Sequence, residues 1–210
     1  RVPSLLIFSC SPVFIYGVNG QTWKAGVATT VITPSESIWL SGYAARTRPA
    51  EGKIHDLWAK ALFLEDKQGE KMLLITMDVS GIKRDISGQI KARLKAETGL
   101  GREQIVLNCS HTHSGPLLKN SYMYLYPLNK EQTENVDRYT EWFMEQVVRL
   151  GMEASQRLEP VNIFSQNGTV RFQVNRRNNK ESELTSLTTL QGPNDYSVPV
   201  LKVEDETGRI

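Results

Sequence analysis

The stretch that decides the fold runs from residue 72 to residue 109 and reads MLLITMDVSGIKRDISGQIKARLKAETGLGREQIVLNC. Its opening segment, 72–77, is a nearly continuous apolar run, which is typical of a strand covered on both faces. Apolar residues then recur every four positions across 83–98, and Gly99 follows where a helix commonly ends, so a helix is predicted there. Residues 105–107 read as another short apolar strand. Strand, helix and strand with short links predict a βαβ unit whose strands are parallel, with a right-handed crossover.

The segments around this unit predict further strands and a second helix. Residues 134–158 carry apolar side chains at steps of three and four and form the strongest helix candidate. Residues 161–174 read as one or two strands around Asn167-Gly168, a pair typical of a hairpin turn. Residues 175–197 are polar and are predicted to be a long loop. The remaining predicted strands are 24–32, 57–64 and 198–203.

Together these segments predict an α/β fold with mixed β-sheet layers and flanking helices, including the βαβ unit over about 72–109. The chain ends at Ile210, directly after a predicted strand and turn. A strand followed by a turn should lead to a partner strand, so we expect an incomplete domain, truncated at residue 210.

The composition is that of a soluble globular protein. The 210 residues are 40% hydrophobic and 23% charged, with a formal net charge of +2. That charge is too small to favour nucleic acid, and no basic cluster interleaved with aromatic residues occurs, so a nucleic-acid partner is not expected.

The N-terminus resembles a secretory signal peptide. Residues 1–20 place an apolar stretch behind Arg1, with small residues ahead of a cut before Gln21. We therefore expect an exported protein, secreted or periplasmic. Two alternatives stay open: Cys10 as a lipid-anchored cysteine, which the apolar residues after it fit less well, and an ordinary first strand.

Two of the three histidines in the chain, His111 and His113, directly follow the second strand of the βαβ unit. Asp78 directly follows the first. Because the carboxyl ends of parallel strands meet at one edge of a sheet, where α/β proteins usually bind ligands, we expect Asp78 and His111 to lie close together.

The spacing of the two histidines is compatible with a metal site. In an extended segment side chains at i and i+2 point the same way, so His111 and His113 could face one ion. A catalytic zinc commonly takes three protein ligands and leaves one position for water, which then ionises near neutral pH. The alternative is a pair of hydrogen-bonded loop histidines.

Other candidate residues have both a functional and a structural interpretation. Asp78 could orient an imidazole or bind the metal, or it could cap a helix. His55, next to Asp56, could likewise orient a metal ligand, but it is more simply a packing residue. Arg176 could bind a carbonyl or hydroxyl group, or be solvated charge. Cys109 is expected to pack as a small apolar residue. The alternating tyrosines of 122–126 could rim an apolar groove or form a core strand.

Several short pieces of the chain occur in a characteristic order. The most specific is the run His111-Thr112-His113-Ser114-Gly115-Pro116. The others are Ala25-Gly26-Val27-Ala28 with Ile32-Thr33-Pro34, Ser41-Gly42-Tyr43, 52–56 with 59–62, Thr76-Met77-Asp78, Asn175-Arg176-Arg177 and 198–203. In this order the pieces resemble the neutral/alkaline ceramidases. The resemblance implies zinc-dependent hydrolysis of the amide bond of N-acylsphingosine (ceramide) to sphingosine and a fatty acid, by metal-activated water. It also implies that residues 21–210 are the N-terminal part of a ceramidase-like catalytic domain.

The resemblance assigns roles by position. His111 resembles the first zinc ligand, and His113 the neighbouring histidine that faces the substrate. Arg176 resembles an arginine near the reacting group, and Gly42 part of the pocket wall. The family's second histidine ligand and its glutamate, tyrosine and serine would fall beyond Ile210, so the resemblance implies that these 210 residues alone are inactive.

Two other functions stay open at this point. One is an exported metallohydrolase of the same fold with a non-lipid substrate, and the other is a non-catalytic binding domain. The expected partner is a lipid-like small-molecule substrate, with peripheral contact to a membrane surface. The oligomeric state stays open.

Overall fold

The computed structural model describes residues 16–17, 23–187 and 189–210. The chain divides into two compact units. One is Gln21–Val161, and the other joins Asn162–Ile210 to the N-terminal residues. Most of the predicted signal peptide, residues 1–20, lies outside the described residues.

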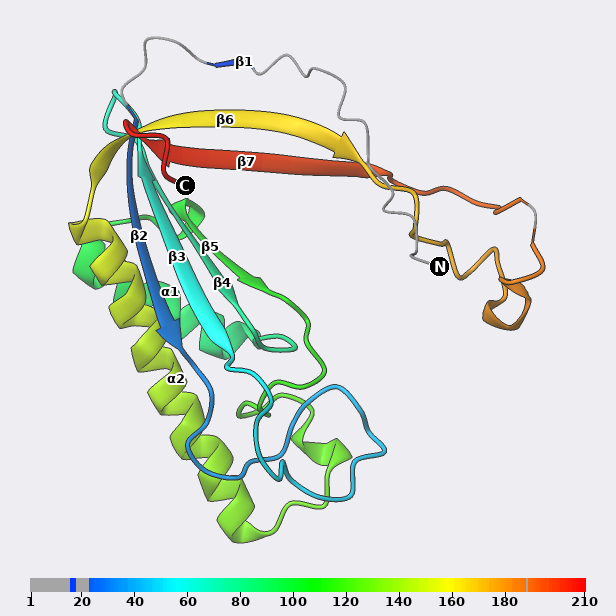
Figure 1. The fold of residues 1–210 in the computed structure, drawn as a ribbon. Helices are drawn as coiled ribbons and strands as arrows, with labels where there is room; N and C mark the ends of the chain where they lie inside the picture. The colour runs from blue at the N-terminus through cyan, green and yellow to red at the C-terminus, as the bar shows by residue number, and fades with distance from the viewer. Residues whose placement is uncertain (1–15, 18–22, 188) are drawn as a thin grey trace, which may run out of the picture. The chain divides into compact units, whose positions relative to one another are not determined.

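The first unit is built on a mixed sheet (Figure 1). Its strands β2 (Trp23–Val31), β3 (Trp58–Glu65), β4 (Lys71–Met77) and β5 (Ile105–Cys109) lie side by side in that order. The pairs β2–β3 and β3–β4 are antiparallel, and β4–β5 is parallel. The first residues of β6 (Glu159–Thr169) pair antiparallel with β2 at its other edge.

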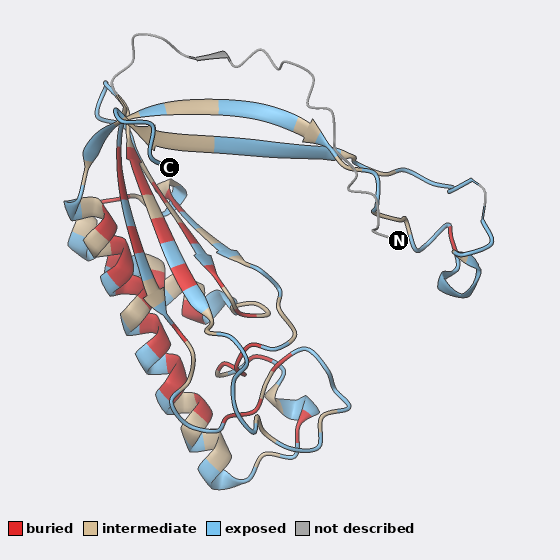
Figure 2. Ribbon diagram, in the orientation of Figure 1, coloured by how far each residue is buried: buried red, intermediate tan, exposed pale blue. Residues whose placement is uncertain are grey.

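Two helices cover one face of this sheet, α1 (Arg84–Thr98) and α2 (Lys130–Gln156) (Figure 1). They pack closely enough that Gly151 of α2 faces Leu94 of α1 as well as Leu73 and Ile75 of β4. The buried residues, red in Figure 2, lie along the two helices and the central strands of the sheet. Two short 3-10 helices complete the unit, η1 (Arg102–Gln104) and η2 (Met123–Leu125).

The predicted α/β class and the βαβ unit are confirmed, because β4, α1 and β5 follow one another and the two strands are parallel. Gly99 ends α1 in the left-handed region, with φ 74°. The helix α2 begins earlier than the apolar pattern predicted. Asn129 caps it, since its side chain accepts from the backbone N–H of Gln132 at 2.8 Å and Gln132 bonds back in return.

The second unit contains the short strand β1 (Tyr16–Gly17), most of β6, the 3-10 helix η3 (Glu181–Glu183) and β7 (Ser197–Asp205), which pairs with β6. Of the one or two strands predicted over 161–174 the structure has one, β6, which continues through Asn167-Gly168, so the hairpin turn predicted at this pair is wrong. A two-residue hairpin turn of this type needs positive φ at both positions, and neither residue has it.

No helix in the described part of the chain is long and apolar enough to cross a membrane.

Candidate functional site

Three loops gather at one edge of the first unit's sheet. Since β2, β4 and β5 end at this edge and β3 begins there, the segments 32–57, 78–83 and 110–129 all emerge from it. Backbone hydrogen bonds join the segments. The N–H of Ser41 donates to the carbonyl of Gly115 at 2.9 Å, and the N–H of Ser110 donates to that of Met77 at 3.0 Å. The topology therefore brings the histidine pair next to the end of β4.

The backbone of His111 is in the left-handed region, with φ 58°, which residues other than glycine rarely adopt. Its N–H donates to the carbonyl of Val79 at 3.1 Å, and its ring Nδ1 lies 2.5 Å from the carbonyl oxygen of Ser80. Left-handed residues other than glycine are uncommon and persist where the surroundings hold them, often at functional sites. Two contacts to the end of β4 supply that support here.

The contact with Ser80 also fixes the tautomer of His111. A carbonyl oxygen can only accept, so Nδ1 must carry the proton that it shares with Ser80. The other ring nitrogen, Nε2, then presents a lone pair. This arrangement, with one nitrogen donating to a carbonyl and the other free, is the one found in metal-binding histidines.

His113 lies beside His111. The two ring centroids are 5.0 Å apart, and the rings meet edge to face at 74°. Gly42, in the loop between β2 and β3, lies directly against His113, so that a Cβ built on it would be 2.5 Å from the Cβ of His113. The structure thus brings together Gly42, His111 and His113.

Gly42 is expected to tolerate no side chain. Its φ is +114°, and an added methyl group would meet His113, so Gly42→Ala should lower the free energy of unfolding by about 2 kcal/mol. Gly52→Ala, in the same loop with open space around it, is the matched control and should change it by less than about 0.5 kcal/mol. Urea unfolding of both variants measures the difference. Equal effects would show that the contact with His113 does not constrain Gly42.

Asp78 and His55 lie in the loops of this edge. The Asp78 carboxylate accepts from the backbone N–H of Trp58 at 3.0 Å and so connects the end of β4 to the start of β3. His55 is exposed, and the carboxylate of its neighbour Asp56 accepts from the hydroxyl of Thr33 at 2.9 Å. The group that orients His111 is the main-chain carbonyl of Ser80, which sequence reasoning missed because every residue type carries a carbonyl.

Arg176 belongs to the second unit. It lies in the loop between β6 and β7, where its guanidinium forms an exposed ion pair with Glu181 at 2.7 Å.

Cys109, at the end of β5, packs against the core as predicted. Burial raises the pKa of its thiol, which disfavours the thiolate that a nucleophile or a metal ligand requires. The tyrosine stretch is a 3-10 helix rather than a strand. Tyr126 is buried against Trp39, with ring centroids 5.5 Å apart, whereas Tyr122 and Tyr124 are exposed.

The two histidines do not by themselves make a metal site. Within residues 16–17, 23–187 and 189–210, no group of three histidine, cysteine or acidic side chains is placed to hold an ion. The tautomer of His111 fits one zinc ligand, and His113 lies at its side. The two histidines therefore fit a zinc ion in part, with His111 as one ligand and His113 as the residue next to it.

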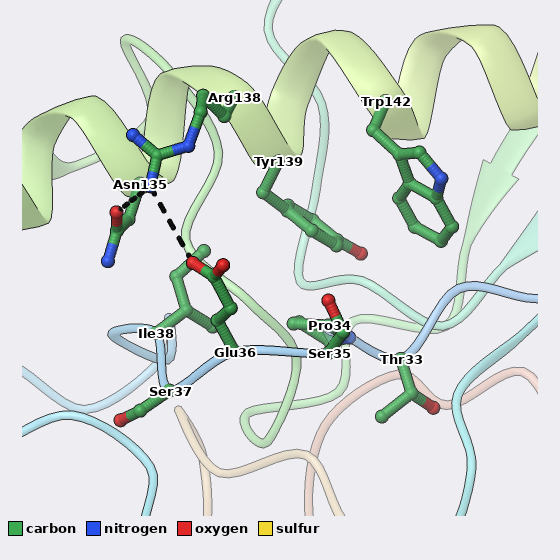
Figure 3. Close-up of a pocket in the computed structure, with 10 residues that line it drawn as sticks. All are labelled: Thr33, Pro34, Ser35, Glu36, Ser37, Ile38, Asn135, Arg138, Tyr139 and Trp142. Atoms are coloured by element: carbon green, nitrogen blue, oxygen red, sulfur yellow. Dashed lines mark hydrogen bonds and ion pairs between the residues drawn. The ribbon is translucent and has the colours of Figure 1, made fainter.

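A cavity of about 390 Å³ lies elsewhere in the first unit, between α2 and the loop that follows β2 (Figure 3). Tyr139 and Trp142 of α2 form one side, and Arg138 forms an ion pair with Glu36 of the loop at 3.6 Å. Neither histidine lines this cavity.

The fold and the histidine pair define an α/β protein with a candidate metal site at the edge of its sheet. The chain belongs to the neutral/alkaline non-lysosomal ceramidase family, whose N-terminal model matches residues 23–204. It is 26% identical to neutral ceramidase of Drosophila melanogaster over 106 residues, which are 49% of this chain and 15% of the relative. A neutral ceramidase of Drosophila pseudoobscura pseudoobscura is also 26% identical, over 103 residues, 48% of this chain and 15% of the relative.

Solved structures of ceramidases share the fold. Neutral ceramidase from Pseudomonas aeruginosa superposes with a TM-score of 0.69 at 22% identity, over 91% of this chain and 31% of that chain. A ceramidase complexed with C2 superposes with a TM-score of 0.65 at 21% identity, over 90% of this chain and 30% of that chain. The chain thus spans about a third of the length of these structures.

Proposed function

We propose that the protein containing this chain hydrolyses the amide bond of ceramide, with zinc as its cofactor. Water adds to the amide carbon, the C–N bond breaks, and the departing amine takes up a proton, which yields sphingosine and a fatty acid. The observation that carries the proposal is the imidazole of His111, with Nδ1 held by Ser80 and Nε2 without a hydrogen-bond partner among the described residues, in a chain of the ceramidase family.

Four residues of this chain would have roles in the reaction. His111 would hold the zinc ion through Nε2. Zinc, when bound, supplies a Lewis acid and a nucleophilic water near neutral pH. His113 would face the substrate and move a proton at its ring. Gly42 would form part of the pocket wall, and Arg176 would bind the substrate, both by position in the family resemblance.

Exposed side chains on the loops at the same edge of the sheet as the two histidines support a lipid-like substrate. Ile54 is 95% exposed and Tyr43 is 58% exposed, and both lie in the loop between β2 and β3. Tyr122, Tyr124 and Leu125 are exposed in the loop that follows β5. Exposed apolar side chains that gather on neighbouring loops are typical of surfaces that contact a ligand, a partner or a membrane. We therefore include peripheral contact with a membrane surface in the proposal, together with export of the protein, which rests on the composition of residues 1–20.

Metal removal tests the proposal. The longest gene product that contains this chain should release sphingosine from N-acylsphingosine in detergent micelles. A zinc chelator should lower the rate at least about tenfold, because the metal supplies the nucleophile, and added zinc should restore it. Sphingosine release and zinc content are measured on the same samples.

Three outcomes would contradict the proposal. A zinc-loaded product that cleaves other amides but leaves ceramide intact would be a metallohydrolase with a non-lipid substrate. A product that purifies without zinc and shows no turnover would be a binding domain. Turnover unaffected by chelation would rule out the zinc.

A further inference from the structure

Arg46 reaches from the loop between β2 and β3 into the loop that carries the histidines. Its Nη2 donates to the main-chain carbonyl of His113 at 2.7 Å. Its Nε is buried and finds no hydrogen-bond partner among the described residues. A guanidinium that is partly withdrawn from water makes a strong, directional bond to the oxygen it contacts. Arg46 therefore holds the backbone of His113 through a hydrogen bond and is not a solvated surface charge.

Tyr43 contacts both the guanidinium of Arg46 and the imidazole of His113. The Arg46 Cζ lies 5.4 Å from the centroid of the Tyr43 ring, and that ring meets the His113 ring edge to face, with centroids 4.9 Å apart. Arg46 thus contacts the backbone of His113 directly and its side chain through Tyr43. Lysine would not reproduce both contacts together, because its ammonium is a point charge, whereas the planar guanidinium donates in fixed directions while another part of it lies over the ring.

The two histidines are held by different parts of the molecule. His111 is fixed by Val79 and Ser80, at the end of β4. The contacts of His113 described here come from the loop between β2 and β3, apart from its neighbour His111. A change at Arg46 should therefore disturb His113 and leave the support of His111 in place.

We propose that Arg46 is a positioning residue that, together with Tyr43, holds the His113 imidazole in its place beside His111. The effect of Arg46 on catalysis rests on the proposed function, in which His113 faces the substrate. Its effect on the position of the His113 ring is independent of that function and can be measured without any turnover.

The test compares Arg46→Met with Arg48→Met in the longest gene product that contains this chain. Methionine keeps much of the length of arginine but neither donates nor carries charge. Arg48 is the matched control, since its side chain is 74% exposed and pairs with Glu51 at the surface. Histidines labelled with ¹³C at Cε1 report the placement of each ring by NMR, and the signals are assigned with His111→Gln and His113→Gln.

In Arg46→Met the His113 signal should split or broaden, because the ring samples more than one position, while the His111 signal stays single. Arg48→Met should leave both signals unchanged. In the ceramide assay, Arg46→Met should lower kcat by about 10- to 100-fold, the usual effect of losing a residue that orients a site histidine. KM should change less than about threefold, since the loss concerns the reacting groups.

A single, unshifted His113 signal in Arg46→Met would overturn the proposal, and so would equal changes in the two arginine variants. If Arg46→Met fails to fold, Arg46→Lys replaces it. That variant keeps the charge and must still split or broaden the His113 signal, and an unchanged signal would overturn the proposal as well. If the wild-type product cleaves no ceramide, the proposed function fails while the NMR comparison still decides the role of Arg46.

Discussion

His111→Ala is expected to abolish most ceramide hydrolysis, with kcat/KM falling at least about 10³-fold, equivalent to about 4 kcal/mol of transition-state stabilisation. The variant removes the imidazole whose Nδ1 is held by the Ser80 carbonyl, and with it the Nε2 proposed to bind zinc. Loss of a ligand should also lower zinc occupancy in the purified product. Sphingosine release and metal content, measured on the longest gene product that contains this chain, check both effects.

His55→Ala is the control for this substitution. It removes the same side chain from an exposed position in another loop of the same edge, and activity should stay within about twofold of wild type if the loss at position 111 is specific. Full zinc occupancy together with full activity in His111→Ala would remove the metal role of this residue and with it the basis of the proposed function.

Gly26→Ala is expected to lower the free energy of unfolding by about 3 kcal/mol. Gly26 lies in β2 where α2 crosses it. A Cβ at this position would collide with the main-chain carbonyl oxygen of Ala154. Backbone atoms cannot rotate away as a side chain can, so the whole helix would have to move off the sheet and loosen the core. Equilibrium unfolding in urea measures the cost.

Gly88→Ala is the matched control. This glycine is inside α1, and nothing lies within 4 Å of an added Cβ. Alanine is the better helix former, so the variant should be more stable by about 0.5–1 kcal/mol. The two substitutions add the same methyl group, and they should therefore shift the midpoint in opposite directions. A neutral Gly26→Ala would mean that α2 can retreat from β2 without loss of packing.

Local patterns were sufficient to predict most of the secondary structure. Periodicity alone located α1, and Gly99 marked its end, because a left-handed residue after a helix favours glycine. The start of α2 was missed because the apolar pattern begins after the cap at Asn129. The turn at Asn167-Gly168 was predicted wrongly because its outcome depends on β7, a partner strand much later in the chain.

The histidine pair was found from its sequence, but the reason for its geometry was not. An extended segment was expected to point both side chains the same way. Instead, His111 is left-handed, and the two rings come together from a bent backbone. Ser80 and Arg46 were missed altogether, and Tyr43 was noted only within the piece Ser41-Gly42-Tyr43, with no role. A main-chain carbonyl, a surface-type tyrosine and one of several arginines carry no pattern that would single them out.

By itself, the sequence determined the order of helices and strands, the parallel βαβ unit and the two histidines that follow it, because these depend on side-chain periodicity and on neighbours along the chain. Only the tertiary structure decided which nitrogen of His111 is free and which arginine supports His113. Those features depend on single hydrogen bonds between loops that are distant in sequence, and such bonds exist only once β2, β4 and β5 have brought their ends to one edge of the sheet.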